Sequence, residues 1–145
     1  MSPGRVDAVT VRRHLIALDE ILSRLTRHAS RPIDVLVNDL DERWAVERGL
    51  QLCTQSVLDI ATHLVASSGR DAPDYATAID ELGRLGIVSS ELAARLRPLA
   101  GFRNVLVHGY LGVDTRRLHA VLNLHLDDVR EFARLVDEYL VRSQS

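Results

Sequence analysis

"ERGLQLCTQSVLDIATHLVA", residues 47–66, is the stretch of this chain with the clearest structural period. Its apolar side chains recur three and four positions apart, which is the spacing of one face of an α-helix. The members of this face are Leu50, Cys53, Val57, Ile60 and Leu64. We expect one long helix over about residues 33–67, with a break near residues 39–41. Because such a face must be buried against other elements, the stretch predicts a helical core.

The same spacing extends over most of the chain and predicts four more helices. They cover about residues 6–26, 75–85, 89–108 and 115–141. Gly86 would end the second of these, and Ser89 or Ser90 would cap the third. No stretch alternates long enough to demand a strand, so the predicted class is all-α, an up-and-down bundle of four to five helices.

The length of 145 residues fits one domain over residues 1–145, since no linker or internal repeat interrupts the pattern. Cys53 is the single cysteine, so neither a disulfide framework nor a thiolate zinc site is available. Metal-binding histidine spacings and a phosphate-binding glycine loop are also absent. We therefore expect no metal and no cofactor.

The sequence carries no signal for a membrane or for export. No run approaches the roughly 18 apolar residues needed to span a bilayer. The first residues, MSPGRVDAV, lack the apolar core of a secretory signal. We expect a cytoplasmic protein that does not contact membranes.

The charge is unevenly distributed although the formal net charge is only −2. Residues 95–117 hold five arginines and one acid, a local balance of +4, whereas residues 34–59 hold six acids and two arginines. A local positive field attracts anions, but the acidic stretch argues against a protein that coats nucleic acid over its whole surface. Any contact with nucleic acid should therefore be focal.

The stretch "FRNVLVHGYLG", residues 102–112, interrupts an apolar run with four polar side chains. On a continuous helix Arg103 would project from the middle of the apolar face, where an unpaired charge is unfavourable and calls for an anion. His108 would lie about 140° away from Arg103. The two can converge if the helix ends near His108, which Gly109 and Gly112 permit, or if a second protomer supplies one of them. Asn104 is one turn before His108 and could orient its ring.

Arg103, Asn104, His108 and Tyr110 match the Arg-Asn-x-x-x-His-x-Tyr signature, so the chain resembles the HepT-like toxins of the HEPN group of helical domains. The long helix around residues 47–66 also looks like that family's second helix. The resemblance implies a HEPN-like homodimer whose two motifs face one cleft, acting as a metal-independent endoribonuclease toxin on RNA. It also implies a partner, an MntA-like nucleotidyltransferase antitoxin. Carried over, Arg103 and His108 are catalytic, Asn104 supports them, and Tyr110 accepts AMP from the antitoxin.

The side chains suit this chemistry. A histidine titrates near neutral pH and can take the proton of a ribose 2′-hydroxyl or donate one to the leaving oxygen. A guanidinium can hold the scissile phosphate and stabilise the charge that builds on its oxygens. The predicted product is a 2′,3′-cyclic phosphate, and AMP on Tyr110 would place phosphate beside Arg103 and obstruct the substrate.

Other interpretations stay open at this point. Arg103 could be structural, paired with Asp59 or Asp80, and His108 could simply end a helix. The whole protein could be a non-catalytic helical module that binds a nucleotidyltransferase or a phosphate ligand. A slanted polar row on the long helix is interpreted as a solvated face or a dimer seam, the alternative being that it lines the cleft opposite Arg103. Its members are Glu47, Gln51, Gln55, Asp59 and His63.

Overall fold

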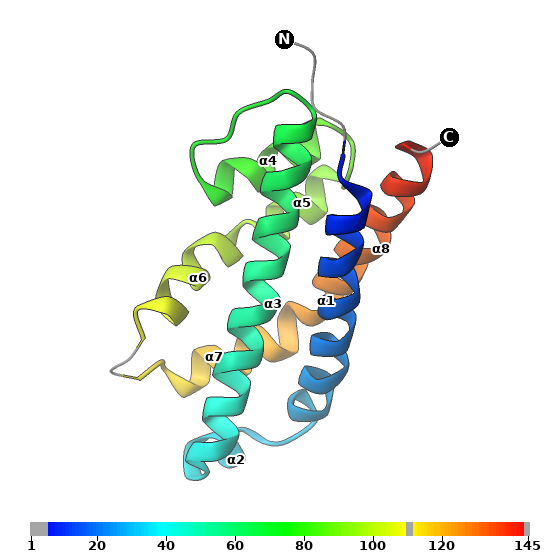
Figure 1. The fold of residues 1–145 in the computed structure, drawn as a ribbon. Coiled ribbons are helices and arrows are strands. Elements are labelled where there is room, and N and C mark those ends of the chain that lie inside the picture. The colour runs from blue at the N-terminus through cyan, green and yellow to red at the C-terminus, as the bar shows by residue number, and fades with distance from the viewer. Residues whose placement is uncertain (1–5, 110–111, 144–145) are drawn as a thin grey trace.

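The computed structural model describes residues 6–109 and 112–143. Within these ranges the chain forms helical segments and no strand, which confirms the all-α class (Figure 1). The segments are α1 (Ala8–Ala29), α2 (Ile33–Asn38), α3 (Leu40–Ser67), α4 (Tyr75–Arg84), α5 (Ser90–Leu96), α6 (Pro98–Val107), α7 (Thr115–Leu124) and α8 (Leu126–Ser143). Each of the five predicted helices is present, and three of them are broken into two segments.

The central element of the bundle is α3, which contacts α1, α2, α4, α6 and α7 (Figure 1). Its start confirms the predicted break. The Asp39 carboxylate accepts hydrogen bonds from the backbone N–H groups of Asp41 at 3.0 Å and Glu42 at 3.2 Å. These contacts satisfy donors that a helix start leaves unpaired, so α3 begins afresh after α2.

The continuous helix expected over residues 89–108 is wrong, because the chain breaks between α5 and α6. Pro98 has no backbone N–H, and its ring clashes with the carbonyl four residues earlier, so it is tolerated only in a first turn. It stands at the start of α6. The new helix direction carries α6 to the side of the bundle, where it contacts α3, α4 and α5 (Figure 1).

The expected terminal helix over residues 115–141 is also divided, at His125. The N–H of His125 still donates to the carbonyl of Val121 at 3.1 Å, but His125 belongs to neither segment. The break leaves Leu124 exposed and places Leu126 in the core. No proline or glycine stands at this point, so the sequence pattern did not reveal it.

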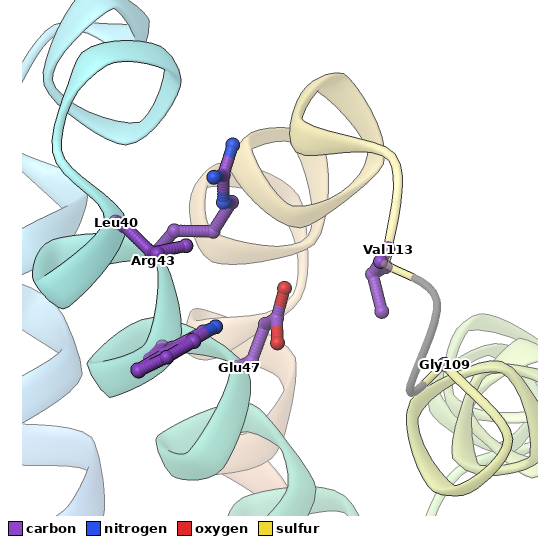
Figure 2. A pocket seen from close by; sticks show the side chains of 7 residues that line it. Leu40, Arg43, Glu47, Gly109 and Val113 are labelled. Carbon is purple, nitrogen blue, oxygen red and sulfur yellow. The ribbon is translucent and has the colours of Figure 1, made fainter.

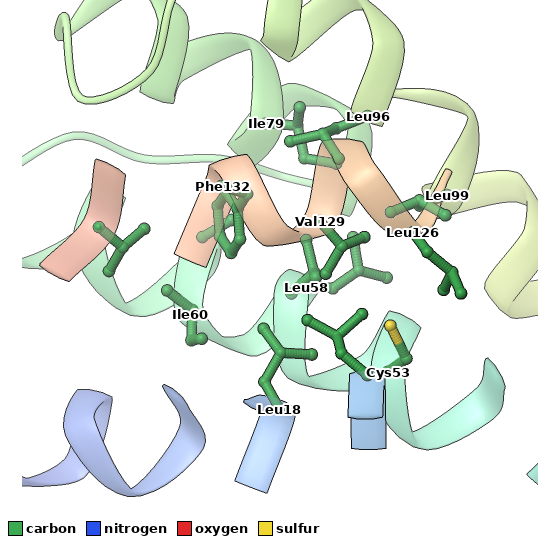
Figure 3. Packing of buried hydrophobic residues seen from close by; sticks show 14 of the residues in the cluster. Leu18, Cys53, Leu58, Ile60, Ile79, Leu96, Leu99, Leu126, Val129 and Phe132 are labelled. Carbon is green, nitrogen blue, oxygen red and sulfur yellow. The ribbon is translucent and has the colours of Figure 1, made fainter. Parts of the chain in front are cut away.

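The hydrophobic core is aliphatic, with Phe132 as its largest fully buried side chain (Figure 3). The predicted face of α3 is entirely buried: Leu50, Cys53, Val57, Ile60 and Leu64. Burying such a side chain stabilises the fold by about 1.5–3 kcal/mol. Burial also raises the pKa of the Cys53 thiol to about 12, so Cys53 acts as a small core hydrophobe. No helix among the described residues is long and apolar enough to cross a bilayer.

Candidate active site

The polar motif sits at the end of α6, a helix with a different buried face from the one predicted. Because α6 restarts at Pro98, Leu99 and Phe102 are its buried residues, with Phe102 only 3% exposed. Arg103 is therefore at the edge of the apolar face rather than in its middle, and it is half-buried. Its guanidinium lies where a neighbouring helix and solvent can both reach it.

Three neutral side chains hold the Arg103 guanidinium. Its Nε donates to Oε1 of Gln55 on α3 at 3.2 Å, and Nη1 donates to Oδ1 of Asn104 at 3.3 Å. Its central carbon stands 5.5 Å from the ring centroid of Tyr75, the first residue of α4, at cation–π distance. Gln55 is itself oriented, because its Nε2 donates to Asp59 at 2.7 Å and to the Tyr75 hydroxyl at 3.4 Å.

Neither carboxylate considered as a structural partner of Arg103 forms an ion pair with it. Asp80 pairs with Nε of Arg97 at 3.2 Å, and Asp59 accepts the hydrogen bond from Gln55. Among the described residues, no carboxylate lies within ion-pair distance of Arg103. The guanidinium is thus fixed in place while its charge is left uncompensated, which is the arrangement that an anion-binding arginine requires.

The positive field around the motif is narrower than the sequence suggested. Arg95 pairs with Asp128 at 3.0 Å and with Glu131 at 3.6 Å, and Arg97 is bound to its own acid. Two of the five arginines of residues 95–117 are therefore neutralised. Arg117 remains nearby, stacked 5.4 Å from the ring centroid of Phe102.

His108 terminates α6 and is exposed. Its backbone N–H donates to the carbonyl of Asn104 at 3.0 Å, with φ −96° and ψ 6°. The helix thus ends at the motif histidine, as one of the two routes to convergence with Arg103 requires. Among the described residues, no hydrogen bond joins the Asn104 amide to the His108 ring, and that amide oxygen accepts from Arg103. Tyr110 lies outside the described residues.

The glycine after His108 is required by close packing. A Cβ at Gly109 would lie 2.6 Å from Cγ2 of Val113 and 2.7 Å from the carbonyl oxygen of Val105. Gly112 has φ +111°, a conformation that side chains disfavour, and its N–H donates to the Gly109 carbonyl at 2.8 Å. These two glycines let the chain after His108 fold closely against the end of α6.

A pocket of about 450 Å³ adjoins this segment (Figure 2). One wall comes from the first turns of α3 and the other from the backbone that follows His108. The lining residues are Leu40, Arg43, Trp44, Glu47, Gly109, Gly112 and Val113. Partial burial raises the pKa of Glu47, although the Arg43 charge and the nearby Val113 backbone act in the opposite direction. The pocket was not predicted, because its walls are more than 60 residues apart in sequence.

The polar row on α3 has mixed roles. Its members are Glu47, Gln51, Gln55, Asp59 and His63. For Gln55 the alternative interpretation is correct, since it faces Arg103. His63 instead accepts a hydrogen bond from the N–H of Asp7 at the start of α1, at 3.2 Å. Tyr75, which was not singled out from the sequence, is the further residue at the site. No three histidine, cysteine, aspartate or glutamate side chains of the described ranges gather so as to hold a metal ion.

Comparison with known proteins places this site in a family. The family model described as "HepT-like: Ribonuclease HepT-like" matches residues 17–136, which include Arg103 and His108. The chain belongs to the HepT-like ribonuclease family. That range also covers Gln55, Tyr75 and Asn104, the residues that contact Arg103.

Two curated relatives and one solved structure extend the comparison. A tRNA nuclease HepT of Aphanizomenon flos-aquae is 28% identical over 138 residues, covering 94% of this chain and 93% of the relative. A putative RNase of Archaeoglobus fulgidus is 31% identical over 123 residues, covering 85% and 82%. A tri-AMPylated HEPN toxin of Shewanella oneidensis, solved in complex with an MNT antitoxin, has a TM-score of 0.78 at 19% identity, covering 88% of this chain and 96% of the toxin. This last likeness shows that the HepT-like chain has the HEPN fold.

Proposed function

We propose that this protein is the toxin of a toxin–antitoxin pair and a metal-independent endoribonuclease that uses the 2′-hydroxyl of its RNA substrate as nucleophile. One observation carries the proposal. In a member of a ribonuclease family, the Arg103 guanidinium is fixed by neutral partners with its charge uncompensated, five residues before an exposed histidine. The transfer-RNA nuclease among the relatives makes transfer RNA the first substrate to test.

In the proposed reaction the 2′-hydroxyl oxygen attacks the adjacent phosphorus, and the bond from phosphorus to the 5′-oxygen breaks. His108 takes the 2′-hydroxyl proton or protonates the leaving 5′-oxygen, since one imidazole can do either depending on its protonation state. The products are a 2′,3′-cyclic phosphate and a 5′-hydroxyl. Arg103 binds the non-bridging phosphate oxygens and stabilises their charge in the transition state.

The partners of Arg103 fit this role. An ion pair with a buried carboxylate would order the side chain but cancel its charge, whereas Gln55 and Tyr75 order it and leave the charge available. Asn104 contacts both catalytic residues. Its side-chain amide oxygen accepts from Arg103, and its backbone carbonyl accepts from the backbone N–H of His108. Asn104 is therefore proposed as a supporting residue.

Regulation is proposed to act at Tyr110. An MntA-like nucleotidyltransferase would transfer AMP from a nucleoside triphosphate to the Tyr110 hydroxyl and release pyrophosphate. The new phosphodiester would then compete with RNA for the Arg103 charge. Support comes from the solved toxin that is both AMPylated and bound to an MNT antitoxin. Co-expression with such an antitoxin should add AMP to the wild type and none to Tyr110→Phe, as read by intact mass.

The decisive experiment is cleavage of a mixed transfer-RNA pool in EDTA by protein made without an antitoxin, beside His108→Ala made identically. Cleavage by the wild type alone, leaving 2′,3′-cyclic phosphate ends, supports the nuclease. No cleavage by protein of unmodified mass, with RNA binding weakened in His108→Ala, supports the non-catalytic binding module instead. Sedimentation tests the proposed homodimer, and a monomer at micromolar concentration argues against a cleft shared by two motifs.

A further inference from the structure

The pocket between α3 and the residues after His108 is lined by side chains that have no role in the proposed reaction. Trp44 is the single tryptophan of the chain and is 59% exposed at the pocket wall. An exposed large aromatic ring offers a face on which a planar group can stack. Gly109, the residue next to His108, lines the same pocket.

Glu47 supplies hydrogen-bond acceptors in the same pocket. Its carboxylate extends from α3 toward the segment that carries Val113 (Figure 2). The backbone of Val113 lies near enough to lower its pKa, but partial burial is the larger effect and keeps the pKa above the ordinary value. A carboxylate has about four acceptor positions, so one backbone contact leaves most of them for a ligand.

Arg43 adds a cation one turn before Glu47. Among the described residues it forms no ion pair with a carboxylate within bonding distance, and it lines the pocket beside Trp44 and Glu47 (Figure 2). Gly109, Gly112 and Val113 line the opposite side of the pocket. The pocket volume of about 450 Å³ is within the range of small-ligand sites.

We propose that this pocket binds a guanine base of the RNA next to the scissile phosphate, with the base stacked on Trp44 and its Watson–Crick edge on Glu47. An ionised carboxylate only accepts hydrogen bonds. Guanine presents two adjacent donors, N1–H and the N2 amino group, which match the two carboxylate oxygens. Adenine and cytosine each present an acceptor beside their amino group, which an ionised carboxylate repels, and uracil presents one donor between two acceptors. Arg43 then faces a phosphate of the same strand.

This assignment rests on the proposed ribonuclease function for the identity of the ligand, but it has its own readout. Since Trp44 is the only tryptophan, intrinsic fluorescence reports directly on the pocket. His108→Ala protein, which should not cleave RNA, is titrated with GMP, AMP, CMP and UMP. We expect saturable quenching by GMP, with binding at least about tenfold weaker for the other three, as expected for a bidentate base contact.

The test variant is Glu47→Gln, which keeps the shape and removes one acceptor and the charge. It should bring the four nucleotides within about threefold of each other, because an amide offers only one acceptor oxygen beside a donor. The matched control is Glu20→Gln, the same change on the exposed surface of α1, which should retain the GMP preference. Circular dichroism confirms that both variants are folded.

The outcomes separate this proposal from the proposed function. GMP preference lost in Glu47→Gln and kept in Glu20→Gln supports the guanine site, even if the transfer-RNA pool is not cleaved, in which case the nuclease proposal fails alone. Absence of quenching, equal quenching by all four nucleotides, or a preference that survives Glu47→Gln overturns the guanine site, even if the pool is cleaved. If the wild type cleaves RNA, its cuts should be enriched beside guanines, and this enrichment should be lost in Glu47→Gln.

Discussion

Gln55→Glu should strongly lower the activity of the enzyme by pairing a carboxylate with Arg103 without changing the shape of the site. The substitution exchanges an amide for a carboxylate whose oxygen would stand where Oε1 now accepts from Nε of Arg103, at 3.2 Å. The variant tests whether the side chains that hold Arg103 must be neutral. The new carboxylate would also face Asp59, which now accepts a hydrogen bond from the Gln55 amide at 2.7 Å. Gln55→Glu/Asp59→Asn removes that repulsion and keeps the charge beside Arg103.

The magnitude follows from the distance. Opposite charges about 4 Å apart attract by about 4 kcal/mol at an effective dielectric constant of about 20. Arg103 is only half-buried, so solvent screens part of this attraction and about 1.5–3 kcal/mol is a reasonable net value. A phosphate that must displace the carboxylate would lose that much, which lowers kcat/KM by about 10- to 100-fold. Gln55→Met, which removes the hydrogen bonds without adding charge, should lose less.

The assay is steady-state cleavage of transfer RNA, with thermal unfolding of each variant measured beside it. The matched control is Gln51→Glu, one turn earlier on α3, where the amide oxygen accepts from Arg48 at 3.2 Å and the same charge is added beside a different arginine. It should cleave within about twofold of the wild type. A folded double variant that cleaves like the wild type would refute the reasoning, as would an equal loss in Gln51→Glu.

Three further outcomes test the site and its support. Arg103→Lys keeps the charge but not the planar fork, and should lower kcat/KM about tenfold or more in the same cleavage assay, so wild-type activity would contradict bidentate phosphate binding. Gly109→Ala should lower the free energy of unfolding by about 1–3 kcal/mol in a denaturant titration, because the added Cβ would meet close contacts. Gly101→Ala, in the open middle of α6, should instead raise it by about 0.5–1 kcal/mol. Equal effects of the two substitutions would contradict the packing argument. Hydrogen bonds from Arg84 and Arg70 lower the pKa of Glu81. The stabilisation that Glu81 provides is therefore present above its ordinary pKa and is lost as pH falls through its pKa in the folded state. Glu81→Gln should therefore make Tm less sensitive to acid, and an unchanged acid profile would exclude this linkage.

Local chemistry made much of the fold predictable. The buried face of α3 followed from spacing alone, and the break before it coincides with the capping Asp39. The break at Pro98 was also readable from the sequence, because a proline cannot stand inside a helix, yet apolar spacing on both sides concealed it. The break at His125 has no such local cause. It is set by packing that buries Leu126, and a periodic pattern does not report that.

The sequence identified the main residues of the site but not the contacts that they make. Arg103 and His108 were found because polar residues stood in an apolar run, and resemblance gave them roles. Their environment depends on residues far away in sequence: Gln55 is 48 positions from Arg103, and Tyr75 is 28 positions away. The sequence spacing placed Arg103 in the middle of the apolar face, because a continuous helix through Pro98 was assumed. Contacts between helices had to come from the tertiary structure.

The placement of Glu47 and Gln55 on α3 explains why one straight helix serves both ends of the motif. Gln55 holds Arg103, which precedes His108, and Glu47 lines a pocket together with Val113, which follows it. Eight residues separate the two on α3, a little over two turns and about 12 Å, so their side chains are about 80° apart around the helix axis. Both residues of α3 belong to one continuous helix. One helix therefore contributes residues to both sides of the motif histidine along the chain, which the motif sequence alone does not reveal.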